Sequence, residues 1–409
     1  MATDQNQKGF IKFSHSEGLM PKEEMLEMQR QKSSLVIGIP REVAHQERRV
    51  GLVPEAVNLL VQNGHTVLIE TNAGAGARFH DHEYSEAGGQ IVYSNKEVFQ
   101  ADIVIKVAPP EDAEIELMKE KMTIFSALHL SNRETVFFRN LMRKKVTAFA
   151  YEYIQDNFGS YPVRRTISEI VGNASIMVAA RYLSDPDYGK GNMLGAFSGI
   201  TPTEVVIIGA GTVAENAARV AIGMGATVKV FDDSIYRLRR IQTNVQSRLF
   251  TSIIQPKVLL KALSSADVVI GAIHNVHGKA PVVVTEEMVH QMKPGSVIID
   301  VSIDQGGCVE TSRITTHQNP VFKKYDVIHY CVPNIASQVP HTASYALSNF
   351  FTPVMLSIGE AGGVDNLIRS DRGLCKGVYV FKGIVTSLAV SEHFDLPFQD
   401  IDLLLAAFH

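Results

Sequence analysis

The sequence has no tryptophan, only three cysteines and no excess of basic residues. The absence of tryptophan says nothing about function. Cys308, Cys331 and Cys375 are dispersed without a C-x-x-C pair, so we expect reduced thiols that serve packing in a cytoplasmic protein. A net charge of −4 gives no indication of nucleic-acid binding. No apolar run approaches the ~18 residues of a membrane span, so no membrane association is expected.

The remaining composition is that of an ordinary soluble globular protein, with 45% hydrophobic and 20% charged residues. A length of 409 residues is enough for two domains with separate cores. Residues 1–34 are polar and lack the apolar segment of a signal peptide. We interpret them as an N-terminal extension outside the fold.

The stretch from Thr203 to Asp232 joins two predicted strands through a glycine-rich turn and a helix. After a β-branched run, Gly209, Gly211 and Ala214 form G-x-G-x-x-A. The first glycine permits a tight turn, the second leaves room for a pyrophosphate, and the alanine lets helix and strand pack closely. Asp232 lies 23 residues after Gly209, where a carboxylate binds the adenosine ribose and repels a 2′-phosphate. The motif alone is weak, but in this context it predicts an NAD site.

Strand-like and helix-like segments alternate on both sides of this stretch, which indicates an α/β protein with parallel, doubly wound sheets. We expect a long helix over 168–183 between two sheets and a helix after Pro340 that returns to the first. The C-terminal part of this return has the weakest pattern. The expected strands are 35–39, 66–70, 91–93, 102–107, 123–128 and 146–151, then 204–208, 228–231, 266–272, 296–302 and 326–333.

Several polar residues follow these strands, where ligands of open parallel sheets bind. Arg49 is a solvated loop residue or a bidentate clamp on a carboxylate. His129 is a hydrogen-bonded structural histidine or a proton-exchanging group. Asp304 either caps the Gly-Gly turn after it or positions a substrate. Lys106 and Asn334 also lie at strand ends.

His274 and His277 have a spacing that invites a metal interpretation. Two histidines without a third ligand nearby are weak evidence, so we expect no metal and favour a loop near the cofactor.

A series of motifs keeps its order and spacing over about residues 35 to 395. In chain order they are GIPREVAHQERRVGLVPEAV, ETNAGAGARFHDHEY, FSALHL, AYEYI, KAPVVVTEEMV, MKPGSVIIDVSIDQGG, HYCVPNIASQVPHTASYALSN and LCKGV. This series resembles the alanine dehydrogenase family, which shares its architecture with the NAD-binding part of proton-translocating transhydrogenases.

The resemblance implies two Rossmann-like domains, of which the NAD domain is inserted into a discontinuous substrate domain. It places the substrate domain at 35–162 and 340–409 and the NAD domain at 163–339. It also implies NAD as the cofactor, a hexamer, and reversible conversion of L-alanine, NAD⁺ and water to pyruvate, ammonium and NADH.

Two groups of site residues follow from the resemblance. On the substrate side it implies a carboxylate-binding arginine, an acid/base histidine and the aspartate of the IDQGG run, which are Arg49, His129 and Asp304. On the cofactor side it implies a phosphate-contacting serine, the glycine-turn residues, an acid with a basic residue five positions on, and a nicotinamide-side asparagine. These are Ser168, Gly209, Gly211, Ala214, Asp232, Arg237 and Asn334.

The sequence departs from the family pattern in two places. The family has K-V-K-E-P and binds substrate with the second lysine, whereas this chain has Ala108 there. Lys106 lies two residues earlier on the same face of the strand. We expect it to bind substrate instead, which requires a shift of the strand or a different position of the substrate. In YPVRRT (161–166), where the family is more apolar, Arg164 and Arg165 are either solvated or contact a larger or more acidic substrate.

The predicted function is NAD-dependent oxidative deamination of L-alanine. The alternatives are a related amino-acid or opine-type dehydrogenase, a transhydrogenase-like NAD-binding subunit, and an NAD-binding protein without catalysis. His129 and Asp304 argue against the second alternative, and Ala108 alone supports the third.

Overall fold

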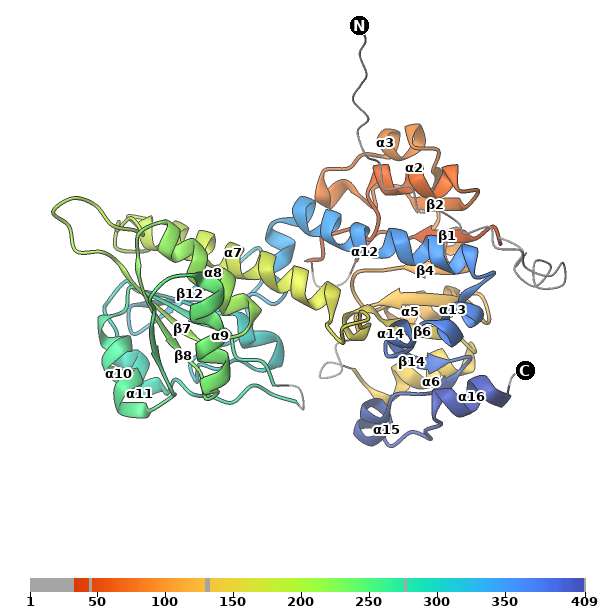
Figure 1. Cartoon of the computed structure of the whole chain (residues 1–409). Coiled ribbons are helices and arrows are strands. Elements are labelled where there is room, and N and C mark those ends of the chain that lie inside the picture. Colours follow the sequence, from red (N-terminus) through yellow and green to blue (C-terminus); the bar gives the residue numbers. More distant parts are fainter. Residues whose placement is uncertain (1–32, 44–45, 129–132, 276–277, 408–409) are drawn as a thin grey trace, which may run out of the picture.

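The computed structural model describes residues 33–43, 46–128, 133–275 and 278–407. The predicted extension therefore lies almost wholly outside the described residues, as does His129. The described chain forms two sheets, each with its own helices, linked by two long helices (Figure 1). Within the described ranges, no helix is long and apolar enough to cross a membrane.

The first sheet has eight strands in the order β15-β14-β6-β5-β4-β1-β2-β3. The strands up to β6 pair in parallel, as predicted, but β14 pairs antiparallel with both β6 and β15. No strand was predicted in the C-terminal return, and β14 joins this edge antiparallel because an antiparallel neighbour needs no crossover helix. The strands are β1 (Val36–Ile39), β2 (Thr66–Glu70), β3 (Gln90–Val92), β4 (Ile103–Ile105), β5 (Thr123–Ser126), β6 (Thr147–Ala150), β14 (Val378–Phe381) and β15 (Ile384–Val385).

The second sheet has seven strands in the order β12-β13-β11-β10-β7-β8-β9, and only β12 is antiparallel. Its strand order reverses between β7 and β10, which creates the switch point where doubly wound sheets bind ligands. The strands are β7 (Glu204–Ile208), β8 (Thr227–Phe231), β9 (Phe250–Ser252), β10 (Val268–Gly271), β11 (Val297–Asp300), β12 (Val321–Lys324) and β13 (Val327–Tyr330).

The central strands are continuously apolar because both faces of each sheet are covered. Along β7, Val205 and Ile207 belong to one core, whereas Val206 and Ile208 belong to the core on the opposite face. The three cysteines are unpaired and buried, as expected. The fold is therefore the predicted α/β class with two doubly wound, Rossmann-like sheets.

Two helices connect the sheets (Figure 1). Helix α7 (Pro162–Ser184) starts six residues before the predicted position, because Pro162 occupies its first turn, where the missing N–H has no cost. It packs closely on α8 at Gly172, where an added Cβ would lie 2.4 Å from the Val213 carbonyl oxygen. Helix α12 (Pro340–Glu360) leads back to the first sheet.

The remaining helices cover the sheets or form the C-terminal return. They are α2 (Pro54–Gln62), α3 (Asp81–Glu86), α4 (Asn95–Val98), α5 (Asp112–Leu117), α6 (Thr135–Arg143), α8 (Thr212–Gly223), α9 (Ile235–Val245), α10 (Pro256–Ser265), α11 (Glu286–His290), α13 (Val364–Ser370), α14 (Arg372–Cys375), α15 (Leu388–Phe394) and α16 (Ile401–Ala407), with short 3₁₀ turns η2 (Ala75–Ala77), η4 (Tyr151–Tyr153), η5 (Val301–Gln305) and η6 (Ile335–Gln338).

Candidate active site

The glycine turn joins β7 to α8 at the switch point of the second sheet. Gly209 has φ +109°, and a Cβ there would lie 2.4 Å from the Ala272 carbonyl oxygen, so only glycine fits. A Cβ at Gly211 would meet nothing within 4 Å, which leaves open space in front of the turn. Ala214 is fully buried where α8 approaches the sheet. This geometry suits a phosphate group held by the N-terminus of α8.

Asp232, at the end of β8, organises this turn. Its buried carboxylate accepts hydrogen bonds from the backbone N–H groups of Ala210 and Ser234, both at 2.7 Å. The Nη1 atom of Arg237 lies 3.8 Å from the same carboxylate. Arg240 donates a hydrogen bond of 3.4 Å to the Ala210 carbonyl oxygen. The acid and the basic residue predicted for the adenosine end thus lie beside the turn.

Arg49 is buried in the loop after β1 and is held side-on by Glu47. Its Nε and Nη2 atoms donate to the two Glu47 oxygens at 2.8 and 2.6 Å. Burial alone would raise the pKa of Glu47, but the charge and hydrogen bonds of Arg49 lower this pKa to about 2. The pKa of Arg49 is raised in turn by Glu47, which outweighs the opposing effect of burial.

Glu47 is the site residue that the sequence interpretation missed. It also accepts hydrogen bonds from Asn334 Nδ2 at 2.5 Å and from Ser337 Oγ at 3.0 Å. It therefore ties the loop after β1 to the loop after β13. The available signal was its spacing, since an acid two residues before Arg49 shares its side of an extended segment.

Asp304, in η5 after β11, completes this cluster. Its side chain is exposed to solvent, yet loss of hydration among the surrounding residues raises its pKa to about 6. A backbone hydrogen bond from Asn334 and the nearby charge of Arg49 oppose that shift. Asn334 itself has a left-handed backbone (φ +61°). The structure thus brings together Arg49, Asp304 and Asn334.

Lys106 occupies a different environment. It is fully buried at the end of β4, and its Nζ lies 3.0 Å from both Glu42 Oε2 and Glu114 Oε1. These two carboxylates raise its pKa against the opposing effect of burial. Glu42 also accepts a hydrogen bond of 2.5 Å from the backbone N–H of Val107. This placement argues against the expected contact of Lys106 with substrate, and Ala108 beyond it offers no cation.

The other predicted residues are placed less completely. His129 lies outside the described residues, directly after Leu128, whose N–H donates to Glu152 Oε1 at 2.8 Å. Ser168 is half-buried near the start of α7. His277 is also outside the described residues, and the described part of the chain holds no group of three metal-ligating side chains.

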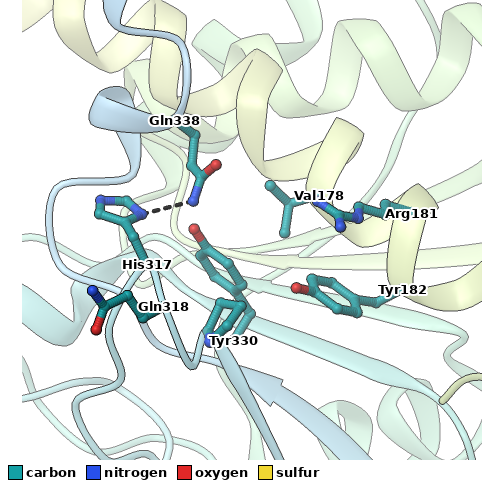
Figure 2. Close-up of a pocket in the computed structure, with 8 residues that line it drawn as sticks. Val178, Arg181, Tyr182, His317, Gln318, Tyr330 and Gln338 are labelled. Atoms are coloured by element: carbon teal, nitrogen blue, oxygen red, sulfur yellow. Dashed lines mark hydrogen bonds between the residues drawn. The ribbon is translucent and has the colours of Figure 1, made fainter. Parts of the chain in front are cut away.

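A cavity of about 320 Å³ lies next to this cluster (Figure 2). Arg181 and Tyr182 of α7 face Tyr330, and His317 pairs with Gln338, whose Nε2 lies 2.6 Å from its Nδ1. None of the predicted site residues lines this cavity. The short turn η6 links the two places, because Asn334 of the Arg49 cluster precedes it and Gln338 of the cavity is its last residue. The cavity is therefore a neighbour of the Arg49 cluster and not part of it.

Two family models cover most of the chain. The N-terminal domain of the alanine dehydrogenase/PNT family matches residues 38–171, and its C-terminal domain matches residues 175–387. The chain belongs to this family.

Individual members of the alanine dehydrogenase/PNT family match over nearly their full length. An alanine dehydrogenase of Methanococcus maripaludis is 42% identical over 373 residues, which make up 91% of this chain and 100% of that protein. A solved L-alanine dehydrogenase structure has a TM-score of 0.83 at 39% identity and covers 88% of this chain and 99% of its own. A transhydrogenase from Sinorhizobium meliloti shares the fold, with a TM-score of 0.73 at 21% identity over 87% of this chain and 99% of its own.

Proposed function

We propose that this protein catalyses NAD-dependent, reversible oxidative deamination of L-alanine to pyruvate and ammonium. The observation that carries the proposal is the convergence of Arg49, Asp304 and Asn334 at the carboxyl ends of strands in the sheet that also carries the Rossmann-type glycine turn. Arg49 comes from the first sheet, and the other two residues come from the second. The full-length match to alanine dehydrogenases supports the choice of substrate.

Arg49 would bind the substrate carboxylate. Glu47 occupies the Nε–Nη2 edge of the guanidinium, which leaves the Nη1–Nη2 end free for a second, bidentate carboxylate. Because Asn334 and Ser337 hold Glu47, the free end of Arg49 keeps one orientation. Such a fixed cation positions the α-carbon of the amino acid.

The cofactor residues fit NAD. The space in front of Gly211 admits a pyrophosphate, and the Asp232 carboxylate favours a ribose hydroxyl over a 2′-phosphate. NAD, when bound, accepts the hydride from the α-carbon. Ser168, Arg237 and Asn334 would add contacts to the phosphates, the adenosine end and the nicotinamide.

Asp304 and His129 would manage protons and water. Asp304 has a pKa of about 6, so it is mostly ionised at neutral pH and is suited to position ammonia or water near Arg49. His129 would act as the general acid/base for the imine and its hydrate. Closure of the two halves would exclude bulk water before hydride transfer.

The proposal includes the division of the chain into an NAD domain at 163–339 and a substrate domain at 35–162 and 340–409. The membership of the strands in two sheets supports this division. A cytoplasmic location and a hexameric homo-oligomer are also part of the proposal. The hexamer rests on the family resemblance alone.

A substrate panel tests the function directly. We expect the purified protein to reduce NAD⁺ with L-alanine, and to oxidise NADH with pyruvate and ammonium, with little activity for NADP. A clear preference for another amino acid would replace this proposal with the second candidate, a related amino-acid dehydrogenase. Ala108 favours that candidate, because the ammonium group expected there is missing.

The variant Ala108→Lys isolates the effect of the missing cation. If the native substrate is alanine, a lysine here should raise kcat/KM for alanine about tenfold, as expected for one added charge-assisted hydrogen bond. Ala108→Met, which has similar length and no charge, is the matched control. Equal activity of the lysine and methionine variants would show that the missing cation does not limit the reaction.

A further inference from the structure

Arg164 and His274 meet between α7 and the loop after β10. Arg164 Nη2 lies 2.9 Å from His274 Nε2. Burial, together with the charges of Arg164 and Arg237, lowers the pKa of His274 to about 4. His274 is therefore neutral at pH 7, and it accepts this hydrogen bond from the guanidinium. Neither of these two side chains has a role in the function proposed above.

This contact lies beside the glycine turn. Ala272, two residues before His274, donates a backbone hydrogen bond to Ile208 at 2.7 Å, and its carbonyl oxygen closes the space behind Gly209. On α7, Ser168 lies one turn after Arg164 and so shares its face of the helix. Arg164 thus stands on the side of α7 that carries the predicted phosphate-contacting serine.

The charges around the turn are unbalanced. Arg165 pairs with Glu169 at 3.4 Å, and Arg237 has Asp232 at 3.8 Å. Among the described residues, Arg164 forms no ion pair with a carboxylate, and its partner His274 is neutral. Arg164, held by the loop that packs against Gly209, is therefore a cation that no described acid neutralises. Two negative charges on a pyrophosphate would complete this arrangement.

We propose that Arg164 and His274 form an additional part of the cofactor site that binds the pyrophosphate beside the glycine turn. The arginine supplies two N–H donors, and the histidine fixes the direction of the guanidinium. This inference rests on NAD being the cofactor in the proposed function. The competing ligand for the same chemistry is a second carboxylate on the substrate.

Direct binding measurements separate these ligands without turnover. Arg164→Leu should weaken binding of ADP-ribose by calorimetry, and of NADH by fluorescence, about 10- to 100-fold, the range for a hydrogen bond to a charged group. Arg165→Leu is the matched control, because this neighbour already pairs with Glu169 and should bind both ligands as the wild type does. Adenosine, which lacks the phosphates, should bind all three proteins equally.

The salt dependence gives a second, independent readout. The loss of affinity in Arg164→Leu should shrink as salt rises from 0.05 to 0.5 M (about the range over which the Debye length falls from ~14 to ~4 Å), because screening removes the same attraction. His274→Leu should cause a smaller loss of the same kind, since it removes only the orientation of Arg164. Thermal melts of each variant check that the fold is kept.

Unchanged ADP-ribose affinity in Arg164→Leu would overturn the inference. An effect confined to the KM of a 2-oxo acid would also overturn it and would assign Arg164 to the substrate. These outcomes differ from failure of the proposed function, in which the wild type binds NADH but no amino acid supports turnover.

Discussion

Asp304 is a carboxyl group whose surroundings oppose its charge. In the folded protein its pKa is raised to about 6, whereas an unfolded aspartate titrates near 3.9. Above pH 6 both states are ionised, and the native state carries the cost of partly desolvating the charge. Between pH 6 and 4 the folded state takes up a proton first, so this cost disappears as the pH falls. Asp304→Asn should therefore stabilise the protein at pH 8, and the gain should decline toward zero near pH 4.

Urea unfolding at several pH values measures this difference. A gain that does not change between pH 8 and pH 4 would contradict the raised pKa. The same variant should lose the rise in kcat/KM that we expect for the wild type as pH increases through about 6. Together the two measurements separate the ionisation of Asp304 from its contribution to the reaction.

At the scale of residues, the sequence was sufficient to identify site residues that directly follow a predicted strand. Arg49, Asp304 and Asn334 each follow a predicted strand, and the structure brings them together. It missed Glu47, because its importance depends on Asn334 and Ser337, which are nearly 290 residues away in the sequence. It also placed Lys106 at the correct strand end without the two carboxylates that enclose it.

Lys106, at the end of β4, forms a buried network of ion pairs that connects three segments of the chain. Lys106 Nζ joins Glu42 in the loop after β1 to Glu114 in α5. Lys106→Met would leave two buried carboxylates without a counter-ion and should reduce the free energy of unfolding by about 3–5 kcal/mol. Lys119→Met is the control, because Lys119 and Asp102 form a half-exposed pair worth about 1 kcal/mol or less.

Urea unfolding of both variants checks this prediction. Equal, small effects would mean that the network is not a structural link and would reopen the role of Lys106 as a substrate ligand. A large loss of stability in Lys106→Met would assign this lysine a structural role between Glu42 and Glu114.

At the scale of elements, the strands of both parallel cores were predicted with bounds that agree to within three residues, except β9, for which no strand was expected. The strands were recognisable there as short continuous apolar runs, because both faces of each strand are buried. The C-terminal return was poorly predicted, since β14 and β15 are short and take their direction from pairing with distant β6. Such pairing leaves no local pattern in the sequence.

The whole molecule consists of two sheets joined by α7, α12 and the cluster around Glu47. The resemblance to a family implied this arrangement, whereas periodicity alone gave only alternating strands and helices. Periodicity could not show that the chain returns to the first sheet, because this return depends on contacts between residues more than 200 positions apart, such as those between β6 and β14.

This architecture predicts two stages of ligand protection in hydrogen exchange. NADH alone should slow exchange mainly around 209–214 and 232–240, where the glycine turn and Asp232 lie, and should leave the first sheet unchanged. Adding pyruvate without ammonium should then protect residues 46–52 and 334–338, because substrate bound to Arg49 would bring the two halves together through Glu47 and Asn334. Mass spectrometry of peptides from both sheets measures this sequence. Pyruvate-dependent protection confined to the second sheet would contradict a substrate site built from both halves, since Arg49 belongs to the first.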